Sequence, residues 1–304
     1  MSPGGGKSGE EDGKNRRKER SLAELLADGE EQLRRAGVEN PDVDARWLMA
    51  DALGCPRTEL ALHLREPLAD NCRKTWENGL ARRRRRVPLQ HILKKMPFAG
   101  VILAVDSRAL IPRPETEELV ELLVERLRTD PPRQILDLGT GSGACILALG
   151  TAFPHAALTA CDRDRRALAL ARANGIRCGL AGRVRWRQSD WFSRLGGTWD
   201  LIVANPPYLS QKEWERCADE VRLFDPFHAL VSEDDGLADG KRILADGVRF
   251  LRPGGLLAME MGAGQGSQLR DFALDQGWGE VRVLRDLGGR DRFLLAAVPD
   301  EGRP

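Results

Sequence analysis

The sequence has few cysteines and histidines, and neither residue type occurs in a disulfide or metal-binding pattern. Its 304 residues include six cysteines with no CxxC pair and four histidines, none at ligand spacing from another histidine or a cysteine. This spacing excludes a disulfide framework and argues against a zinc site. We therefore expect reduced cysteines, as in a cytoplasmic protein, and no bound metal.

A long apolar run and an excess of charge of one sign are also absent. No stretch approaches the ~18–20 apolar residues of a membrane-spanning helix, and the polar, glycine-rich N-terminus shows no signal-peptide pattern. The 47 basic residues are balanced by 46 acidic ones, which argues against a protein that coats nucleic acid or an anionic membrane. We expect a monomer with no membrane partner and no stable nucleic-acid partner.

The first part of the chain predicts a tail and then a small helical domain. Residues 1–20 contain almost no apolar side chain, so we expect them to be disordered. Residues 21–86 show helical patterns: Ser21 and Glu24 form a capping box ahead of several leucines, and Asn40 precedes a helix with proline at its first position.

The last of these helices ends in five consecutive arginines, residues 82–86. Such a run is consistent with contact to RNA or another polyanion. It is equally consistent with a solvated helix C-terminus, where the helix dipole favours cations. The sequence leaves both interpretations open.

Residues 87–111 predict a β-hairpin that links the helical domain to the remainder of the chain. Segments 98–106 and 109–111 have the composition of strand pieces around a turn. A stiff segment with two prolines follows and leads into a helix over 118–127, whose first turn is acidic.

From residue 134 onward, strands and helices alternate. This alternation predicts parallel strands joined by right-handed crossovers. Only residues 288–292 separate the last two strands, so that pair should be antiparallel. The expected fold class is α/β, with a seven-stranded, mostly parallel sheet. Its strands are expected at 135–138, 158–162, 184–188, 201–204, 256–260, 281–285 and 293–298, and its helices at 144–153, 163–174, 236–251 and 266–276.

The turn Asn205-Pro206-Pro207-Tyr208 follows the fourth of these strands and includes the chain's only tyrosine. The prolines end the strand because they lack a backbone N–H and restrict φ. An amide and an aromatic ring are thus held at the carboxyl end of a strand, where ligands bind in open α/β sheets. An ordinary polar turn is the alternative interpretation.

Residues 137–143, with the sequence DLGTGSG, join the first strand to its helix and let the backbone approach a ligand closely. A GxGxG string alone also fits a dinucleotide site. Here, however, an acid precedes the glycines, and Asp162 ends the next strand, where it can accept hydrogen bonds from a ribose diol. Asp162 can instead cap the helix beginning at Arg163. The cofactor-binding residues expected here are Asp137, Gly139, Thr140, Gly141, Ser142, Gly143 and Asp162.

Asp190 and Trp191 follow the third strand and extend this predicted pocket. Asp190 can accept from an adenine amino group, and Trp191 can lie against the adenine face, although core packing is the alternative for the ring. The pocket has no phosphate-binding lysine. It therefore suits S-adenosylmethionine, which has no phosphate and is cationic at sulfur.

Several strings resemble those of known methyltransferases. DLGTGSG, the acid after the second strand and NPPY after the fourth are similar to class I methyltransferases. The longer strings IPRPETEELV, QSDWF and NPPYLS resemble the bacterial release-factor glutamine methyltransferases of the PrmC/HemK family. The resemblance covers nearly everything after residue 20, including the helical domain and hairpin. One departure is HILKKM at residues 91–96, where the family usually has an aromatic residue, Ile, Leu and Gly.

The resemblance implies transfer of a methyl group from S-adenosylmethionine to the side-chain amide (N5) of the glutamine in the Gly-Gly-Gln motif of peptide-chain release factors. Residues 112–304 would form the S-adenosylmethionine-dependent methyltransferase domain, and residues 21–86 would dock the release factor. Asn205 would also contact the cofactor. The expected catalytic residues are Asn205, Pro206, Pro207 and Tyr208, and those expected beside substrate or cofactor are Arg113, Pro114, Glu115 and Thr116.

A carboxamide nitrogen is a poor nucleophile because its lone pair is delocalised. The Asn205 side-chain oxygen and the Pro206 carbonyl can accept the N–H groups of the amide and stabilise developing positive charge, while Tyr208 packs on the amide plane. The alternatives are an amino-methyltransferase for a ribosomal-protein glutamine or a nucleic-acid base, and a non-catalytic module that binds RNA through its arginines.

Overall fold

The computed structural model describes residues 20–300, and the chain divides into two compact units between Arg86 and Val87. The predicted disordered tail, apart from Arg20, lies outside the described residues. Within residues 20–300, no helix is long and apolar enough to cross a bilayer.

The first unit is a small helical bundle. Its helices are α1 (Leu22–Arg35), α2 (Pro41–Leu53), the 3-10 helix η1 (Arg57–His63) and α3 (Asp70–Arg84). The predicted capping box forms, with Ser21 and Glu24 bonding to each other's backbone N–H. The Trp76 ring packs so closely on Gly29 that a Cβ there would lie 2.6 Å from it, so helix α1 needs glycine at this position.

Within the run at 82–86, side-chain hydrogen bonds join Arg83, Arg84 and Arg86 to other residues of this unit. Arg83 is buried, with its Nε 2.6 Å from the Asp44 carboxylate. Arg84 donates to the side-chain oxygen of Gln32 and Arg86 to the backbone carbonyl of Gly37. The buried and paired Arg83 is therefore not available to a phosphate, whereas Arg84 and Arg85 are exposed, so both interpretations of the run stay open.

The second unit opens with helix α4 (Leu89–Leu93) and a β-hairpin of β1 (Lys95–Phe98) and β2 (Val101–Ala104). The predicted hairpin is present but lies at 95–104: the predicted segment 98–106 contains β2 and the turn before it, and the predicted strand 109–111 is wrong. The chain reverses at Ala99 and Gly100, which both have positive φ, as a two-residue hairpin turn requires. Residues 109–111 form no strand in the structure.

A seven-stranded sheet in the order β5-β4-β3-β6-β7-β9-β8 forms the centre of this unit. Six strands are parallel, and β9 runs antiparallel to both of its neighbours, as the short connection predicted. The strands are β3 (Gln134–Leu138), β4 (Ala157–Asp162), β5 (Val184–Gln188), β6 (Trp199–Ala204), β7 (Leu251–Glu260), β8 (Glu280–Arg285) and β9 (Asp291–Ala297).

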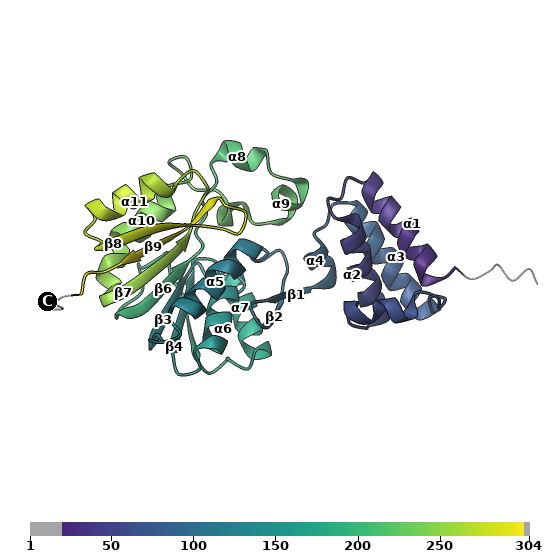
Figure 1. The fold of residues 1–304 in the computed structure, drawn as a ribbon, viewed down its shortest axis with the longest axis horizontal. Helices are drawn as coiled ribbons and strands as arrows, with labels where there is room; N and C mark the ends of the chain where they lie inside the picture. Colours follow the sequence, from purple (N-terminus) through teal and green to yellow (C-terminus); the bar gives the residue numbers. More distant parts are fainter. Residues whose placement is uncertain (1–19, 301–304) are drawn as a thin grey trace, which may run out of the picture. The chain divides into compact units, whose positions relative to one another are not determined.

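Helices cover both faces of the sheet (Figure 1). One face packs on α5 (Pro114–Arg126), α6 (Ala144–Ala152) and α7 (Arg165–Arg177), and the other on α10 (Ala238–Gly247), the 3-10 helix η3 (Val248–Phe250) and α11 (Gly266–Asp275). The sequence did not predict the short helices α8 (Gln211–Glu215), α9 (Asp219–Phe224) and η2 (Phe227–Ala229), which lie between β6 and α10. This layered arrangement leaves the carboxyl ends of β3, β4, β5 and β6 to form one cavity.

Candidate functional site

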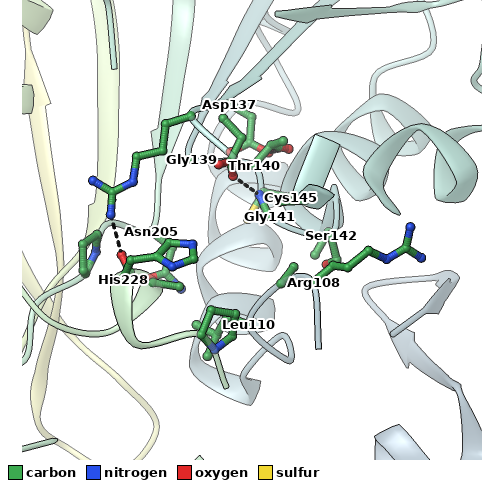
Figure 2. Close-up of a pocket in the computed structure, with 18 of the residues that line it drawn as sticks. Arg108, Leu110, Asp137, Gly139, Thr140, Gly141, Ser142, Cys145, Asn205 and His228 are labelled. Carbon is green, nitrogen blue, oxygen red and sulfur yellow. Dashed lines mark hydrogen bonds between the residues drawn. The ribbon is translucent and has the colours of Figure 1, made fainter. Parts of the chain in front are cut away.

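The cavity has an empty volume of about 930 Å³, including its open mouth. Figure 2 shows residues of the loop after β3, the turn after β6 and the segment around His228 surrounding the same space. Among the predicted site residues, those that line it are Asp137, Gly139, Thr140, Gly141, Ser142, Asp162, Asp190, Trp191, Asn205, Pro207 and Thr116. Six other predicted site residues do not line the cavity: Gly143, Pro206, Tyr208, Arg113, Pro114 and Glu115.

The glycine-rich loop has left-handed backbone at Gly139, Gly141 and Gly143, with φ of 68°, 55° and 86°. Side chains at these positions would be strained, which explains the spacing of the three glycines. Asp137 is buried beneath the loop and accepts from Thr140 Oγ1 at 2.6 Å. Burial raises the pKa of the Asp137 carboxyl to about 7, and the bond from Thr140 only partly opposes this.

Asp162 holds two backbone segments at the end of β4. Its Oδ2 accepts from the Gly141 N–H at 3.0 Å and its Oδ1 from the Asp164 N–H at 2.8 Å. The alternative role as a helix cap is wrong, because helix α7 begins at Arg165 and its cap is Asp164. Each carboxylate oxygen of Asp162 keeps a second lone pair, so the side chain can still accept from a ligand.

The Trp191 ring belongs both to the cavity wall and to the core. It is only 9% exposed and packs among core residues such as Phe192, while it also faces the glycine loop: a Cβ at Gly139 would lie 3.1 Å from it. Its Nε1 donates to Asp239 at 3.0 Å. The neighbouring Asp190 is half-exposed and pairs with Arg242.

On the opposite side of the site, Asn205 belongs to a hydrogen-bonded network with Thr116, Glu260 and Tyr208, here called the Glu260 network. Asn205 Nδ2 donates to Thr116 Oγ1 at 2.9 Å, and Thr116 donates to the Glu260 carboxylate at 2.6 Å. Tyr208 donates its hydroxyl to the other Glu260 oxygen at 3.0 Å. Sequence reasoning missed Glu260, although it is an acid at the end of an apolar strand, the same signal that Asp137 and Asp162 give.

Of residues 112–117, the PRPETE segment, Pro112 and Thr116 line the cavity, whereas Arg113 and Glu115 do not. Arg113 instead pairs with the buried Asp225 carboxylate at 2.5 Å, and Glu115 lies 3.5 Å from the Arg290 guanidinium. The bond to Asp225 anchors the segment that follows it, from which Pro226, His228 and Ala229 line the cavity. Sequence analysis assigned no role to this segment, because nothing local indicates that it crosses the site.

The cavity is lined by charges of both signs. Carboxyl groups of Asp137, Asp162 and Asp190 line it, and so do the guanidinium groups of Arg108 and Arg163. Among residues 20–300 no group of three His, Cys, Asp or Glu side chains could bind a metal ion. The carboxyl groups lie around the glycine loop, where they can accept hydrogen bonds from an organic ligand.

The fold and site define the class of protein. The sheet order, with the antiparallel strand β9 between β7 and β8, and the glycine loop after β3 are those of a class I methyltransferase. Residues 116–223 match the family model of the Methyltransferase small domain. Among solved structures, the hMettl16 catalytic domain in complex with a MAT2A 3'UTR hairpin superposes with a TM-score of 0.57 at 20% identity, covering 74% of this chain and 83% of that one, which shows the shared fold.

Sequence comparisons narrow the class to one family. Residues 24–93 match the model of the PrmC N-terminal domain. The release factor glutamine methyltransferase of Deinococcus radiodurans is 39% identical over 275 residues, 90% of this chain and 98% of that protein. The Cereibacter sphaeroides protein of the same name is 39% identical over 278 residues, 91% and 98% of the two chains. The chain therefore belongs to the family of release factor glutamine methyltransferases.

Proposed function

We propose that this protein transfers a methyl group from S-adenosylmethionine to the side-chain amide nitrogen of the glutamine in the Gly-Gly-Gln motif of peptide-chain release factors. The main support is the position of Asn205 at the cavity, next to a loop built for a nucleoside, in a chain whose relatives bear that name over nearly their full length.

The cavity fits S-adenosylmethionine. Asp162 has lone pairs for the ribose hydroxyls, the Trp191 ring and Asp190 form the wall expected for adenine, and the left-handed glycines let the backbone approach the ligand. When bound, this cofactor supplies an electrophilic methyl group on a positively charged sulfur. The carboxylates around the cavity favour that charge.

The Asn205 side chain has the geometry to hold a substrate amide. Its nitrogen is bonded to Thr116, so its oxygen is the group left for a ligand in the cavity. An acceptor at that position bonds an N–H of the glutamine amide and stabilises the positive charge that develops on nitrogen. Tyr208 does not line the cavity, but its hydroxyl bonds to Glu260 and so holds the turn that carries Asn205.

The helical unit is the part of the chain proposed to dock the release factor, because every residue that lines the cavity comes after Arg86. Removing residues 1–86 should leave S-adenosylmethionine binding largely intact and sharply lower methylation of a whole release factor. A truncated protein that folds and methylates the intact factor at full efficiency would rule out docking. We also propose a cytoplasmic monomer that has no stable nucleic-acid partner.

The decisive experiment supplies labelled S-adenosylmethionine to the full chain together with a purified release factor, a ribosomal-protein mixture or RNA. We expect label only in the release factor, on its Gly-Gly-Gln peptide by mass spectrometry. A release factor whose motif glutamine is replaced by alanine is the matched control and should stay unlabelled. Label on a ribosomal protein or on RNA would instead support the alternative substrates.

A further inference from the structure

Glu260 is a buried carboxylate directly behind the catalytic turn. It ends strand β7, is 1% exposed, and accepts hydrogen bonds from Thr116 and Tyr208, one on each oxygen. The nearby Arg292 guanidinium lies 5.8 Å from the centre of the Tyr208 ring and bonds to the Met261 carbonyl. Burial raises the pKa of the Glu260 carboxyl, whereas the bonds from Thr116 and Tyr208 and the charge of Arg292 favour its ionised form.

The direction of these bonds fixes the orientation of Asn205. A threonine hydroxyl has one proton, and an ionised carboxylate can only accept. With Glu260 ionised, Thr116 gives its proton to Glu260 and its oxygen accepts from Asn205, which is the pattern of bonds in the structure. The –NH₂ end of the Asn205 amide is consequently held against Thr116, and its oxygen is the end available to the cavity.

The opposite orientation would disable the site. With the amide reversed, Asn205 would present N–H groups to the N–H groups of a substrate amide, so donor would face donor. Packing around the side chain cannot select the productive orientation, because the two ends of an Asn amide have nearly the same shape. Only hydrogen bonds distinguish the oxygen from the nitrogen.

We propose that Glu260 is a positioning residue for methyl transfer: through Thr116 it selects the orientation of Asn205 in which the side-chain oxygen faces the substrate, and through Tyr208 it fixes the aromatic ring of the same turn. The inference rests on the proposed function for its consequence in catalysis. The orientation itself is a property of the protein and can be measured without substrate. A bond chain that ends on a carboxylate also makes the Asn205 oxygen a stronger acceptor.

The sharpest variant is Thr116→Val, which keeps the shape of the side chain and removes the hydroxyl that joins Glu260 to Asn205. We expect single-turnover methyl transfer at saturating cofactor and release factor to fall at least 10-fold, and up to the ~10²–10³-fold typical of losing one preorganised partner. The affinity for S-adenosylmethionine should stay within about twofold, because only positioning is lost. Thr116→Ser should recover most of the loss. Thr151→Val, the same change in α6 where the hydroxyl bonds only to the Leu147 carbonyl, is the matched control.

A readout independent of activity is the NMR spectrum of the Asn205 side-chain amide in protein labelled with ¹⁵N-asparagine. Its pair of signals, assigned by their loss in Asn205→Ala, should show slow proton exchange in the wild type and fast exchange in Thr116→Val and Glu260→Gln. Because the chain has one tyrosine, ¹³C-labelled tyrosine gives one ring signal per carbon. That signal should shift in Glu260→Gln and stay nearly unchanged in Thr116→Val.

Wild-type transfer rates in Thr116→Val, or unchanged Asn205 amide exchange in both variants, would overturn the inference. If Glu260→Gln fails to fold, Thr116→Val decides the question alone, because it leaves Glu260 and Tyr208 in place. If the wild-type protein methylates no release factor, the proposed function fails, and the amide spectra still report whether Glu260 orients Asn205.

Discussion

Hydrogen bonds of very different reach hold the two sides of the cavity. On the glycine-loop side, Thr140 bonds to Asp137, three residues away, and Asp162 to Asp164, two residues away; the bond from Gly141 to Asp162 spans 21 residues. On the Asn205 side, the bonds of the Glu260 network span 52, 89 and 144 residues. The glycine-loop side therefore forms largely from residues close in sequence, whereas the Asn205 side forms only when distant segments pack together.

This difference leads us to expect a division of labour. The glycine-loop side should determine cofactor affinity, since its residues line the predicted nucleoside pocket. The Asn205 side should determine the rate of transfer, since its polar groups are aimed at a charge that develops in the transition state. Substitutions on the two sides should therefore change different measured quantities.

The largest effect is expected for Asn205→Ala, which removes the acceptor facing the substrate. Methyl transfer in single-turnover assays should fall by ~10²–10³ while cofactor affinity falls far less. Asn205→Asp keeps an acceptor toward the cavity but places a carboxylate oxygen against Thr116, whose proton is bonded to Glu260. Its rate should lie between those of alanine and wild type. A wild-type rate in Asn205→Ala would mean that the turn is only structural.

The opposite pattern is expected for Asp162→Ala. Loss of its carboxylate should weaken S-adenosylmethionine binding by about 1.5–3 kcal/mol, the range for hydrogen bonds to charged groups. At saturating cofactor the transfer rate should stay within about tenfold of wild type. Calorimetry at matched folded fraction gives the affinity. Unchanged affinity would leave Asp162 as a support for Gly141 and Asp164 only.

A pH dependence of cofactor binding should follow from Asp137. Burial raises the pKa of its carboxyl to about 7, so the ligand-free protein binds this proton below that pH. An unfolded chain releases it at its ordinary, lower pKa, so this group's contribution to stability is present at acidic pH and is lost as pH rises toward about 7.

A cationic cofactor favours the ionised form of Asp137, so binding below about pH 7 should release a proton. Affinity should then fall by up to about tenfold per pH unit below that value. Calorimetry at pH 6 in two buffers of different ionisation enthalpy measures the released proton, and Asp137→Asn should lower it to the share of Asp162, whose pKa burial also raises. Equal heats in both buffers for the wild type would show that Asp137 does not respond to the cofactor.

The smallest effect is expected at Lys94, which belongs to neither side of the cavity. Its φ of 58° is left-handed, a conformation that glycine adopts without strain. Lys94→Gly should relieve backbone strain and raise the free energy of unfolding by up to about 1 kcal/mol, without changing cofactor affinity or transfer rate. Denaturant unfolding measures it, with the exposed, ordinary-φ neighbour Lys95→Gly as a control that should not stabilise. A loss of stability in Lys94→Gly would show that the lysine side chain contributes more than its backbone costs.

The sequence predicted the parts of the site whose signals are local. Glycines at alternate positions, acids at strand ends and prolines after β6 each have a conformational meaning within a few residues. The same reasoning misplaced the hairpin turn. The apolar run at 98–106 was predicted as a strand, although the chain turns at Ala99 and Gly100. Sequence reasoning also failed to separate Thr116 from Arg113 and Glu115, because which of three neighbouring side chains faces the cavity depends on how helix α5 is placed against the sheet.

The sequence by itself therefore determined the strands of the sheet, the antiparallel final pair, the glycine loop and the carboxylate that supports it, since each depends on periodicity or on backbone preferences of single residues. Only the tertiary structure decided which acid stands behind Asn205, which end of its amide faces the substrate, and that the segment after Asp225 borders the cavity. The physical reason is distance along the chain: Glu260 and Thr116 are 144 residues apart, and no local preference encodes a bond that exists only after β7 and α5 pack together.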